Sequence, residues 1–210
     1  MSTNSTRRDD GIARQRGVTL IELVMFIVVV GIAVAGILLV YTNTVRHSSD
    51  PVIRKQMLAV AEALLEEVEL MPFTYCDPDD ANAATANAAI VGAGGCASAV
   101  ELIGPEAGEA RYTPANPFDN VNDYAGFDTA SASPSGIADI SGSVITTLGG
   151  YRAQISASAQ PLGPAGSTIA ATDGNGAAQV LLVTVTVTAP DGDSVSLSGY
   201  RTRYAPNAMP

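Results

Sequence analysis

The pattern of apolar and polar positions divides the chain into three parts. An apolar run occupies residues 23–41, a helical pattern follows over residues 51–71, and an alternation typical of strands begins only at residue 150. Between them, residues 72–140 carry little periodicity and are rich in Ala, Gly, Asn and Pro, which is typical of loops. This order predicts a helical N-terminal part, an irregular middle region and a C-terminal sheet.

The first apolar run is long enough to cross a membrane as one helix. No charged residue occurs from Leu23 to Val45, and 23 residues at about 1.5 Å of rise per residue cover roughly 34 Å, compared with a hydrocarbon core of about 30 Å. Val and Ile disfavour a helix slightly in water, but in lipid any other conformation would leave backbone groups without hydrogen bonds. We therefore predict a transmembrane and assembly helix over residues 18–47.

The second pattern predicts an amphipathic helix over residues 51–71. Asp50 and Pro51 combine an N-cap residue with a proline at the first helical position, so this segment either begins a new helix or kinks a continuous one. The apolar positions recur every three or four residues, at Met57, Val60, Ala61, Leu64, Leu65, Val68 and Met71.

The charges of this second helix run against its dipole. Basic residues, Arg54 and Lys55, stand near its beginning, and the acidic ones stand near its end, at Glu62, Glu66, Glu67 and Glu69. We interpret the acidic residues as a solvated face. The alternative is that they pair with the basic end of the same helix in a neighbouring copy of the chain.

The last third of the sequence predicts an antiparallel sheet of three or more strands within residues 141–204. A turn at Pro190–Asp193 joins the last two of the alternating segments, and the apolar face of the middle strand carries Leu181, Val183, Val185 and Val187. The strands are predicted within residues 150–157, 180–188 and 194–204. Because the helix over 51–71 can cover that face, the predicted fold class is α+β, with one domain over residues 48–210.

Glu22 stands at the beginning of the apolar run, where a carboxylate needs a partner. A charge at the centre of a membrane helix costs roughly 2.5 to 3.5 kcal/mol on insertion scales, so an acid near such a segment is by default functional. The residues Gly17, Val18, Thr19, Leu20, Ile21 and Glu22 form a motif. This motif resembles the class III signal of type IV pilins and type II secretion pseudopilins.

The resemblance implies a processing site and an assembly residue. A prepilin peptidase would cut between Gly17 and Val18 on the cytoplasmic side and methylate the new amino terminus on Val18. Glu22, fifth in the mature chain, would pair with a terminal amine during assembly. Gly31 matches a glycine that is common in the helices of this family. Two residues depart from the family pattern: Val18 replaces the more usual Phe, and Leu39 stands where many major pilins carry a Pro that kinks the helix. A secretory signal peptide fits less well, because its apolar core spans only about 7 to 15 residues.

Residues 1–17 are then expected to be a leader that is absent from the mature protein. Its four arginines favour the cytoplasm, which places the chain after Tyr41 in the periplasm, as a single-pass protein of the bacterial inner membrane. Removing the leader leaves 7 basic and 19 acidic residues, a net charge of −12. Such a charge argues against nucleic acid or an anionic membrane surface as a partner.

Cys76 and Cys96 are the two cysteines of the chain, and both lie in the part expected outside the membrane. In an oxidising periplasm, a disulfide that closes a loop of about 20 residues would stabilise the fold by about 3 kcal/mol. The alternatives, a redox pair or metal ligands, lack C-x-x-C spacing and nearby histidines. We therefore predict a disulfide between Cys76 and Cys96.

Acidic residues gather in two loop segments, Phe118–Asp128 and Asp173–Gly176. Calcium is the functional alternative at both, because hard oxygen ligands are dense there. The EF-hand spacing is missing, and turn-forming Asn, Asp and Gly explain the composition equally well. We therefore predict no metal site and no cofactor.

The order of the elements also resembles the type IV pilin fold, and residues 118–128 resemble a motif of the D-type minor pilins of mannose-sensitive haemagglutinin pili. The resemblance implies a minor pilin that acts in pilus assembly and surface interaction. Its partners would be prepilin peptidase, other pilin subunits and the pilus assembly platform. The alternatives are a minor pseudopilin of a type II secretion system and, in a different class, a membrane-tethered periplasmic binding module or enzyme.

We expect no catalytic residues, because G-x-S-x-G, H-E-x-x-H and phosphate-loop motifs are missing.

Overall fold

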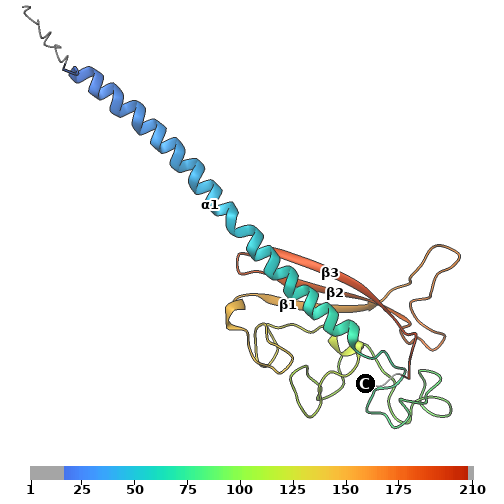
Figure 1. Ribbon diagram of the computed structural model, residues 1–210. Coiled ribbons are helices and arrows are strands. Elements are labelled where there is room, and N and C mark those ends of the chain that lie inside the picture. The colour runs from blue at the N-terminus through green and yellow to red at the C-terminus, as the bar shows by residue number, and fades with distance from the viewer. Residues whose placement is uncertain (1–16, 208–210) are drawn as a thin grey trace, which may run out of the picture. The chain divides into compact units, whose positions relative to one another are not determined.

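The computed structural model describes residues 17–207, apart from the side chains of residues 43–50 (Figure 1). The chain divides into two compact units, Met1–Asp50 and Pro51–Pro210; the second is called the head below. In chain order the elements are helix α1 (Leu20–Leu70), the short 3₁₀ helices η1 (Val121–Tyr124) and η2 (Thr146–Leu148), and strands β1 (Arg152–Ala159), β2 (Val180–Thr188) and β3 (Ser194–Thr202). The predicted α+β class is therefore confirmed.

The described part of the first unit is the N-terminal portion of α1. Within it, Leu20–Thr42 is a 23-residue stretch that is long and apolar enough to cross a membrane, and its side chains are exposed. The helix begins at Leu20 and remains helical through Pro51. Of the two alternatives for this proline, the start of a separate helix is therefore wrong.

The head is built on a contact between α1 and the sheet, which lie against each other in Figure 1. The helix contributes a stripe of buried side chains spaced by three or four residues, namely Met57, Ala61, Leu64 and Val68. The middle strand contributes alternate residues that are all fully buried, namely Leu181, Val183, Val185 and Val187. The amphipathic helix and the apolar face of this strand are thus confirmed.

The sheet is antiparallel throughout, with β2 between β1 and β3. In its register Val183 pairs with Ala157 of β1 and with Gly199 of β3. Gly199 lies where α1 comes close, and a Cβ there would displace the end of the exposed Glu69 side chain. The opposite face of β2 is polar: Thr184 and Thr186 hydrogen-bond Ser198 and Ser196 across the strands, each at 2.8 Å.

The boundaries of the sheet differ from the sequence prediction at both ends. Residues 141–151 were expected to belong to it, but they form turns and the 3₁₀ helix η2, and β1 begins at Arg152. At Gly150 the backbone has a φ of +86°, which favours glycine and turns the chain before the strand. The last strand ends at Thr202, two residues before the expected Tyr204.

The middle region is irregular, as predicted, and is held together by covalent and polar contacts. Cys76 and Cys96 form the predicted disulfide, with Cα atoms 5.4 Å apart, and pack with Ala83 and Ala86 in a small second core. Nearby, the Asp80 carboxylate accepts hydrogen bonds from the backbone N–H groups of Ala97, Ser98 and Ala99 at 2.7–3.1 Å. These bonds, the one from Ala97 most of all, hold the pKa of Asp80 below its usual range.

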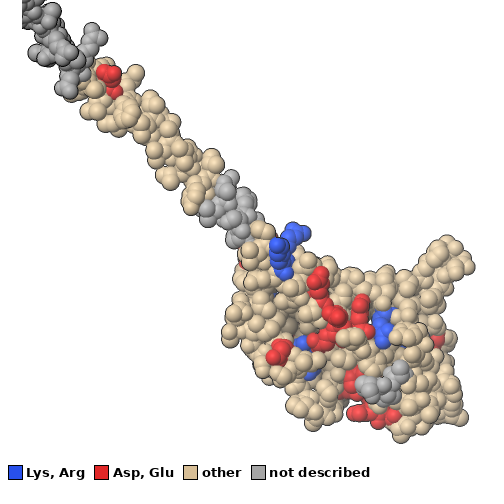
Figure 2. Space-filling view, viewed as in Figure 1, with Lys and Arg blue, Asp and Glu red and all other residues tan. Residues whose placement is uncertain are grey.

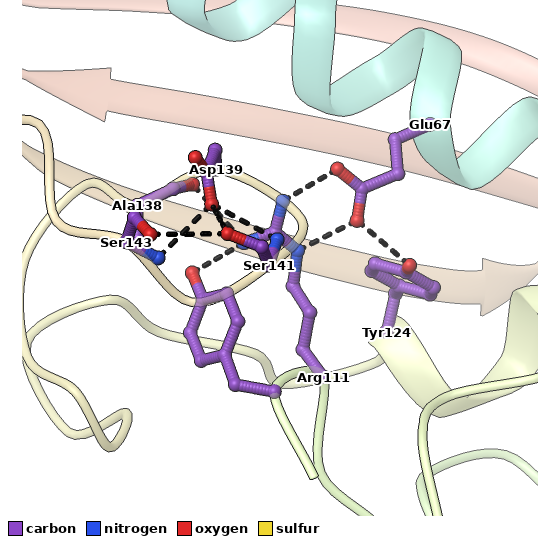
Figure 3. A network of polar contacts seen from close by, with 8 residues as sticks. Glu67, Arg111, Tyr124, Ala138, Asp139, Ser141 and Ser143 are labelled. Carbon is purple, nitrogen blue, oxygen red and sulfur yellow. Dashed lines mark hydrogen bonds and ion pairs between the residues drawn. The ribbon is translucent and has the colours of Figure 1, made fainter. Parts of the chain in front are cut away.

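A buried ion pair joins the middle region to α1 (Figure 3). The Arg111 guanidinium donates to both Glu67 oxygens, from Nε at 2.6 Å and from Nη2 at 2.5 Å, and the Tyr124 hydroxyl donates to Glu67 Oε1 at 2.8 Å. The Arg111 side chain is 3% exposed and that of Glu67 is 14% exposed. The interpretation of Glu67 as part of a solvated face is therefore wrong, because this residue lies beside the buried stripe. The other three acids of the helix are exposed, as expected.

We expect Arg111→Ala to lower the free energy of unfolding by about 3 kcal/mol, because it leaves the Glu67 carboxylate largely buried without its partner. The matched control is Arg152→Ala, which removes an ion pair with Asp128 in which the arginine side chain is 49% exposed. That change should cost less than about 1 kcal/mol. Chemical denaturation of the detergent-solubilised chain measures both.

The double variant Glu67→Ala with Arg111→Ala should lose less than the two single losses combined, because neither charge is then left alone. Equal losses for Arg111→Ala and the Arg152→Ala control would contradict this account of the network.

Candidate functional site

The N-terminal motif lies at the beginning of α1. Thr19 precedes the first helical residue, and its carbonyl accepts the first helical hydrogen bond from the Leu23 N–H at 3.1 Å. Its hydroxyl accepts a longer bond, at 3.4 Å, from the backbone N–H of Glu22. Thr19 and Glu22 thus stand at the N-cap and N3 positions, the spacing of a capping box.

Glu22 therefore has a local role that sequence reasoning did not identify. Its carboxylate lies in the first turn of α1, where negative charge complements the helix dipole. Gly17 and Val18 directly precede the cap, so the expected cleavage site borders on the helix. The expected leader, apart from Gly17, lies outside the described residues. The start of α1 thus combines the Thr19 cap, which accepts the Glu22 N–H, with the negative charge of the Glu22 carboxylate.

The second candidate site is a cluster of carboxylates in the head, where Figure 2 shows acidic side chains gathered on one face. It consists of two groups, in each of which one oxygen per residue lies within 4.8 Å of the others. We call Glu101, Glu106 and Asp123 the inner group, since Glu101 and Asp123 are buried. The outer group, whose members are all half-buried, is Asp77, Glu109 and Asp119.

Backbone pairing brings the members of the inner group together. A bridge between Cys76 and Val100, next to the disulfide, is followed by a hydrogen bond from the Glu101 N–H to the Tyr75 carbonyl at 3.1 Å. The loop after Glu101 then reaches η1, where the Gly104 N–H donates to the Asn122 carbonyl at 3.1 Å. Glu101 is thereby positioned against the 3₁₀ helix that carries Asp123.

Asp123 is oriented by the N-terminus of η1. Its Oδ2 atom accepts hydrogen bonds from the backbone N–H groups of Asn120 at 2.8 Å and Asp119 at 3.0 Å, which forms a capping box with Asn120. Its Oδ1 atom is buried and has no hydrogen-bond partner. One oxygen is therefore fixed by the backbone, and the other is left for a ligand.

Glu101 is the least satisfied of these residues. It is 3% exposed, and neither carboxylate oxygen has a hydrogen-bond partner. Among residues 17–207, no lysine or arginine with a described side chain forms an ion pair with the six carboxylates. The charge of Arg203 acts on Glu101 without a hydrogen bond: its guanidinium nitrogens are also buried without a partner, and the group stacks 4.4 Å from the centre of the Phe73 ring. Buried carboxylates without partners are rare, because their desolvation is not offset.

This environment makes the carboxyls weak acids. Burial, with the charges of Asp123 and Glu106 next, raises the pKa of Glu101 to about 10. Burial is also the largest cause at three other carboxyls, raising the pKa of Glu106 to about 8, of Asp119 to about 7 and of Asp123 to about 6. Their ordinary values lie near 4. Without a counter-charge, the raised pKa values of Glu101 and Glu106 therefore leave these two carboxyls protonated at neutral pH.

The chemistry of this donor set suits a hard cation. All six side chains offer carboxylate oxygens, and both cysteines are committed to the disulfide. Zinc and copper sites use histidine nitrogen or cysteine sulfur, whereas calcium and magnesium take oxygen ligands. The cluster also shows no Ser, Cys or His nucleophile among its members.

Sequence reasoning identified only part of this cluster. For residues 118–128 no metal site was predicted and calcium was only the alternative, but two of their acids, Asp119 and Asp123, do belong to the cluster. The third, Asp128, instead accepts hydrogen bonds from Arg152, including one from Nε at 2.9 Å. The other four members are spread over residues 77–109, so no linear motif could reveal them. In the other acidic segment, Asp173–Gly176, the Asp173 carboxylate accepts hydrogen bonds from the backbone N–H groups of Asn175 and Ala177 and forms the turn.

No family description, curated protein or solved structure that was compared with the chain matches it. The resemblance to pilins therefore rests on the residues of the N-terminal motif and on the order of the elements.

In protein kept free of metal ions by a chelator, we expect the folded state to lose stability as the pH rises from about 6 to about 9. Unfolded carboxyls ionise near pH 4, so over this window the folded state binds more protons, and the free energy of unfolding falls with pH. Melting temperatures across the pH series measure the effect. Glu101→Gln, which cannot ionise, should make the decline shallower, and a wild-type curve without any decline would contradict the prediction.

Proposed function

We propose that the chain is a minor pilin, an inner-membrane subunit that enters a type IV filament of the mannose-sensitive haemagglutinin kind, most like its D-type subunit. One observation carries the proposal. A Gly-Val-Thr-Leu-Ile-Glu motif at residues 17–22 leads into the first turn of a helix that is long and apolar enough to span a membrane. The same chain carries a head in which helix packs on antiparallel sheet.

The exposed surface of α1 supports this proposal. Within Leu20–Thr42 the apolar side chains are uncovered, with exposed fractions such as 71% for Ile32 and 73% for Leu39. An apolar surface of this extent marks a membrane or an interaction site. A bilayer would cover it before assembly, and the helices of neighbouring subunits would cover it in a filament.

The proposed topology assigns each part a compartment. The leader would remain in the cytoplasm, the apolar helix would cross the inner membrane, and the head would fold in the periplasm. A disulfide between Cys76 and Cys96 suits that oxidising compartment. Prepilin peptidase, other pilin subunits and the assembly platform would then be the partners, and the work of the protein would be assembly and surface interaction.

The proposal predicts cleavage between Gly17 and Val18. Intact-mass measurement of membrane-extracted protein should show loss of residues 1–17 and one added methyl group on Val18. Cells that lack prepilin peptidase provide the control and should retain the full mass, and Gly17→Ala should be processed more slowly. A full-length mass in cells with active peptidase would overturn the assignment of the motif.

Glu22 is expected to act through its charge as well as through the helix cap. Within the dry core of a filament, its carboxylate would pair with the amine of Val18, its own or that of a neighbour. Glu22→Ala and Glu22→Gln should both be inserted and cleaved normally. Loss of a buried partner costs roughly 3 to 5 kcal/mol, so incorporation into sheared filaments should fall more than a hundredfold.

Thr19→Ala separates the two roles of Glu22. This change removes the hydroxyl that accepts the Glu22 N–H, a cap worth about 1 kcal/mol, and keeps the carboxylate. Incorporation should therefore fall by less than about tenfold. If Glu22→Gln entered filaments normally while Thr19→Ala did not, the Thr19 cap and not the Glu22 carboxylate would be what incorporation requires.

A further inference from the structure

The acidic cluster in the head leads to an inference that is independent of filament assembly. We propose that the inner group, Glu101, Glu106 and Asp123, binds one Ca²⁺ ion. Each of the three residues directs one carboxylate oxygen into a space in which the three atoms lie within 4.8 Å of one another. Calcium–oxygen distances are about 2.3 to 2.6 Å, so ligands on opposite sides of one ion lie about 5 Å apart.

The unpartnered oxygens are what distinguish this group from an ordinary acidic surface. Acidic side chains on a surface are hydrated, whereas Glu101 is 3% exposed and Asp123 is fully buried. Both oxygens of Glu101 and Oδ1 of Asp123 lack a hydrogen-bond partner. A bound cation would satisfy these atoms together, and no hydrogen-bond donor of the described chain does so.

Asp123 is held in place for this role by the backbone. Its second oxygen accepts two N–H groups at the start of η1, so the carboxylate cannot rotate without losing both bonds. Hydrogen bonds of this kind orient ligands in metal sites. On the opposite side, the bridge beside the disulfide positions Glu101. The two buried ligands are therefore presented by fixed segments of the chain.

Within the described part of the chain, Arg203 is an alternative counter-charge for Glu101, because the two side chains attract each other. Its guanidinium stacks on the rings of Phe73 and Tyr75, at 4.4 and 5.0 Å from their centres, and makes no hydrogen bond to the inner group. Even a direct pair would neutralise one of the three inner charges. The outer group adds three more carboxylates next to it, so a divalent ion fits the local charge better.

Calcium fits the site better than other divalent ions. The ligands are all carboxylate oxygens on irregular backbone, and calcium accepts six to eight oxygens in flexible geometry, whereas magnesium demands near-octahedral geometry and retains water. Water and the outer group are available to complete the coordination. We expect a dissociation constant at or below about 1 mM, the range of extracellular calcium modules.

Binding would couple the middle region to the rest of the head. Asp123 adjoins Tyr124, whose hydroxyl donates to Glu67 on α1, and Glu101 lies beyond the disulfide-linked loop. An ion shared by the three ligands would therefore hold two separate segments together, the loop that carries Glu101 and Glu106 and the 3₁₀ helix η1. Because the folded state alone assembles the ligands, calcium should raise the melting temperature in proportion to the logarithm of its concentration above the dissociation constant.

The experiment uses the full chain in detergent, treated with chelator and then titrated with CaCl₂ or MgCl₂. Calorimetry should give one Ca²⁺ per chain, and the melting temperature should rise with CaCl₂ and rise less with equal MgCl₂. Absence of both heat and a thermal shift up to about 10 mM CaCl₂ would overturn the proposal. Equal binding of Mg²⁺ would overturn the choice of calcium.

Two variants and a matched control assign the site. Glu101→Gln should weaken Ca²⁺ binding at least tenfold, while its melting temperature in chelator should be no lower than that of the wild type, because buried Glu101 must take up a proton on folding and Gln need not. Glu106→Gln, at a half-buried ligand, should also weaken binding and covers the case in which the first variant misfolds. Asp79→Asn makes the same charge change at an exposed position and should alter affinity less than about threefold. Equal losses in all three variants would show a diffuse charge effect and overturn the assignment.

Discussion

The head depends on the contact between one apolar face of its sheet and one stripe of α1. A sheet of three strands has two faces and no second sheet to cover either, so its apolar face must be buried by a helix. Four side chains of β2 are fully buried there, and burying each aliphatic side chain contributes roughly 1.5 to 3 kcal/mol. The polar face carries Thr and Ser pairs that remain at the surface. This contact fixes which way the helix and the strands face and leaves the middle region to pack around them.

The middle region is held by a mixture of forces. Its large apolar side chains join the core that α1 and the sheet form, namely Phe73, Phe118, Val121, Tyr124 and Ile137. It relies further on one disulfide, on carboxylates that accept backbone N–H groups, and on the buried pair between Arg111 and Glu67. Such contacts are directional, so they can hold irregular backbone in a single arrangement. They also allow several carboxylates to lie close together, because backbone that is fixed by contacts on several sides can hold side chains that repel one another. The inner group of carboxylates is placed at the point where these segments meet.

The chain separates its chemistry between its two units. The described part of the first unit presents aliphatic side chains and has one described acid, Glu22, at the start of its helix. The head contains the ion pairs, the disulfide and the acidic cluster. A function that depends on the apolar helix and one that depends on the acidic cluster therefore use different residues and can be altered independently. Filament incorporation and calcium binding are accordingly separate questions about the same protein.

The periodic parts of this protein were determined by the sequence alone. The apolar stretch, the amphipathic stripe from Met57 to Met71 and the alternation in β2 are local patterns, and local patterns specify which face of an element is buried. The disulfide also followed from the sequence, because only two cysteines were available to pair. The predicted ends of the sheet were less accurate, because the turns at Gly150 and after Thr202 depend on adjacent segments of the same chain.

Only the tertiary structure decided the arrangement of the charged residues. Glu67 follows the same helical pattern as its exposed neighbours, and its burial depends on Arg111, which is 44 residues away. Glu101 and Glu106 lie in one loop and Asp123 lies in η1, and their proximity arises from the bridge beside the disulfide and from η1. A sequence pattern reports what one element presents to its surroundings, whereas a charge cluster is set by distances between elements that have no common period. The carboxylates of this head could therefore be counted in the sequence, but which of them meet was decided by the fold.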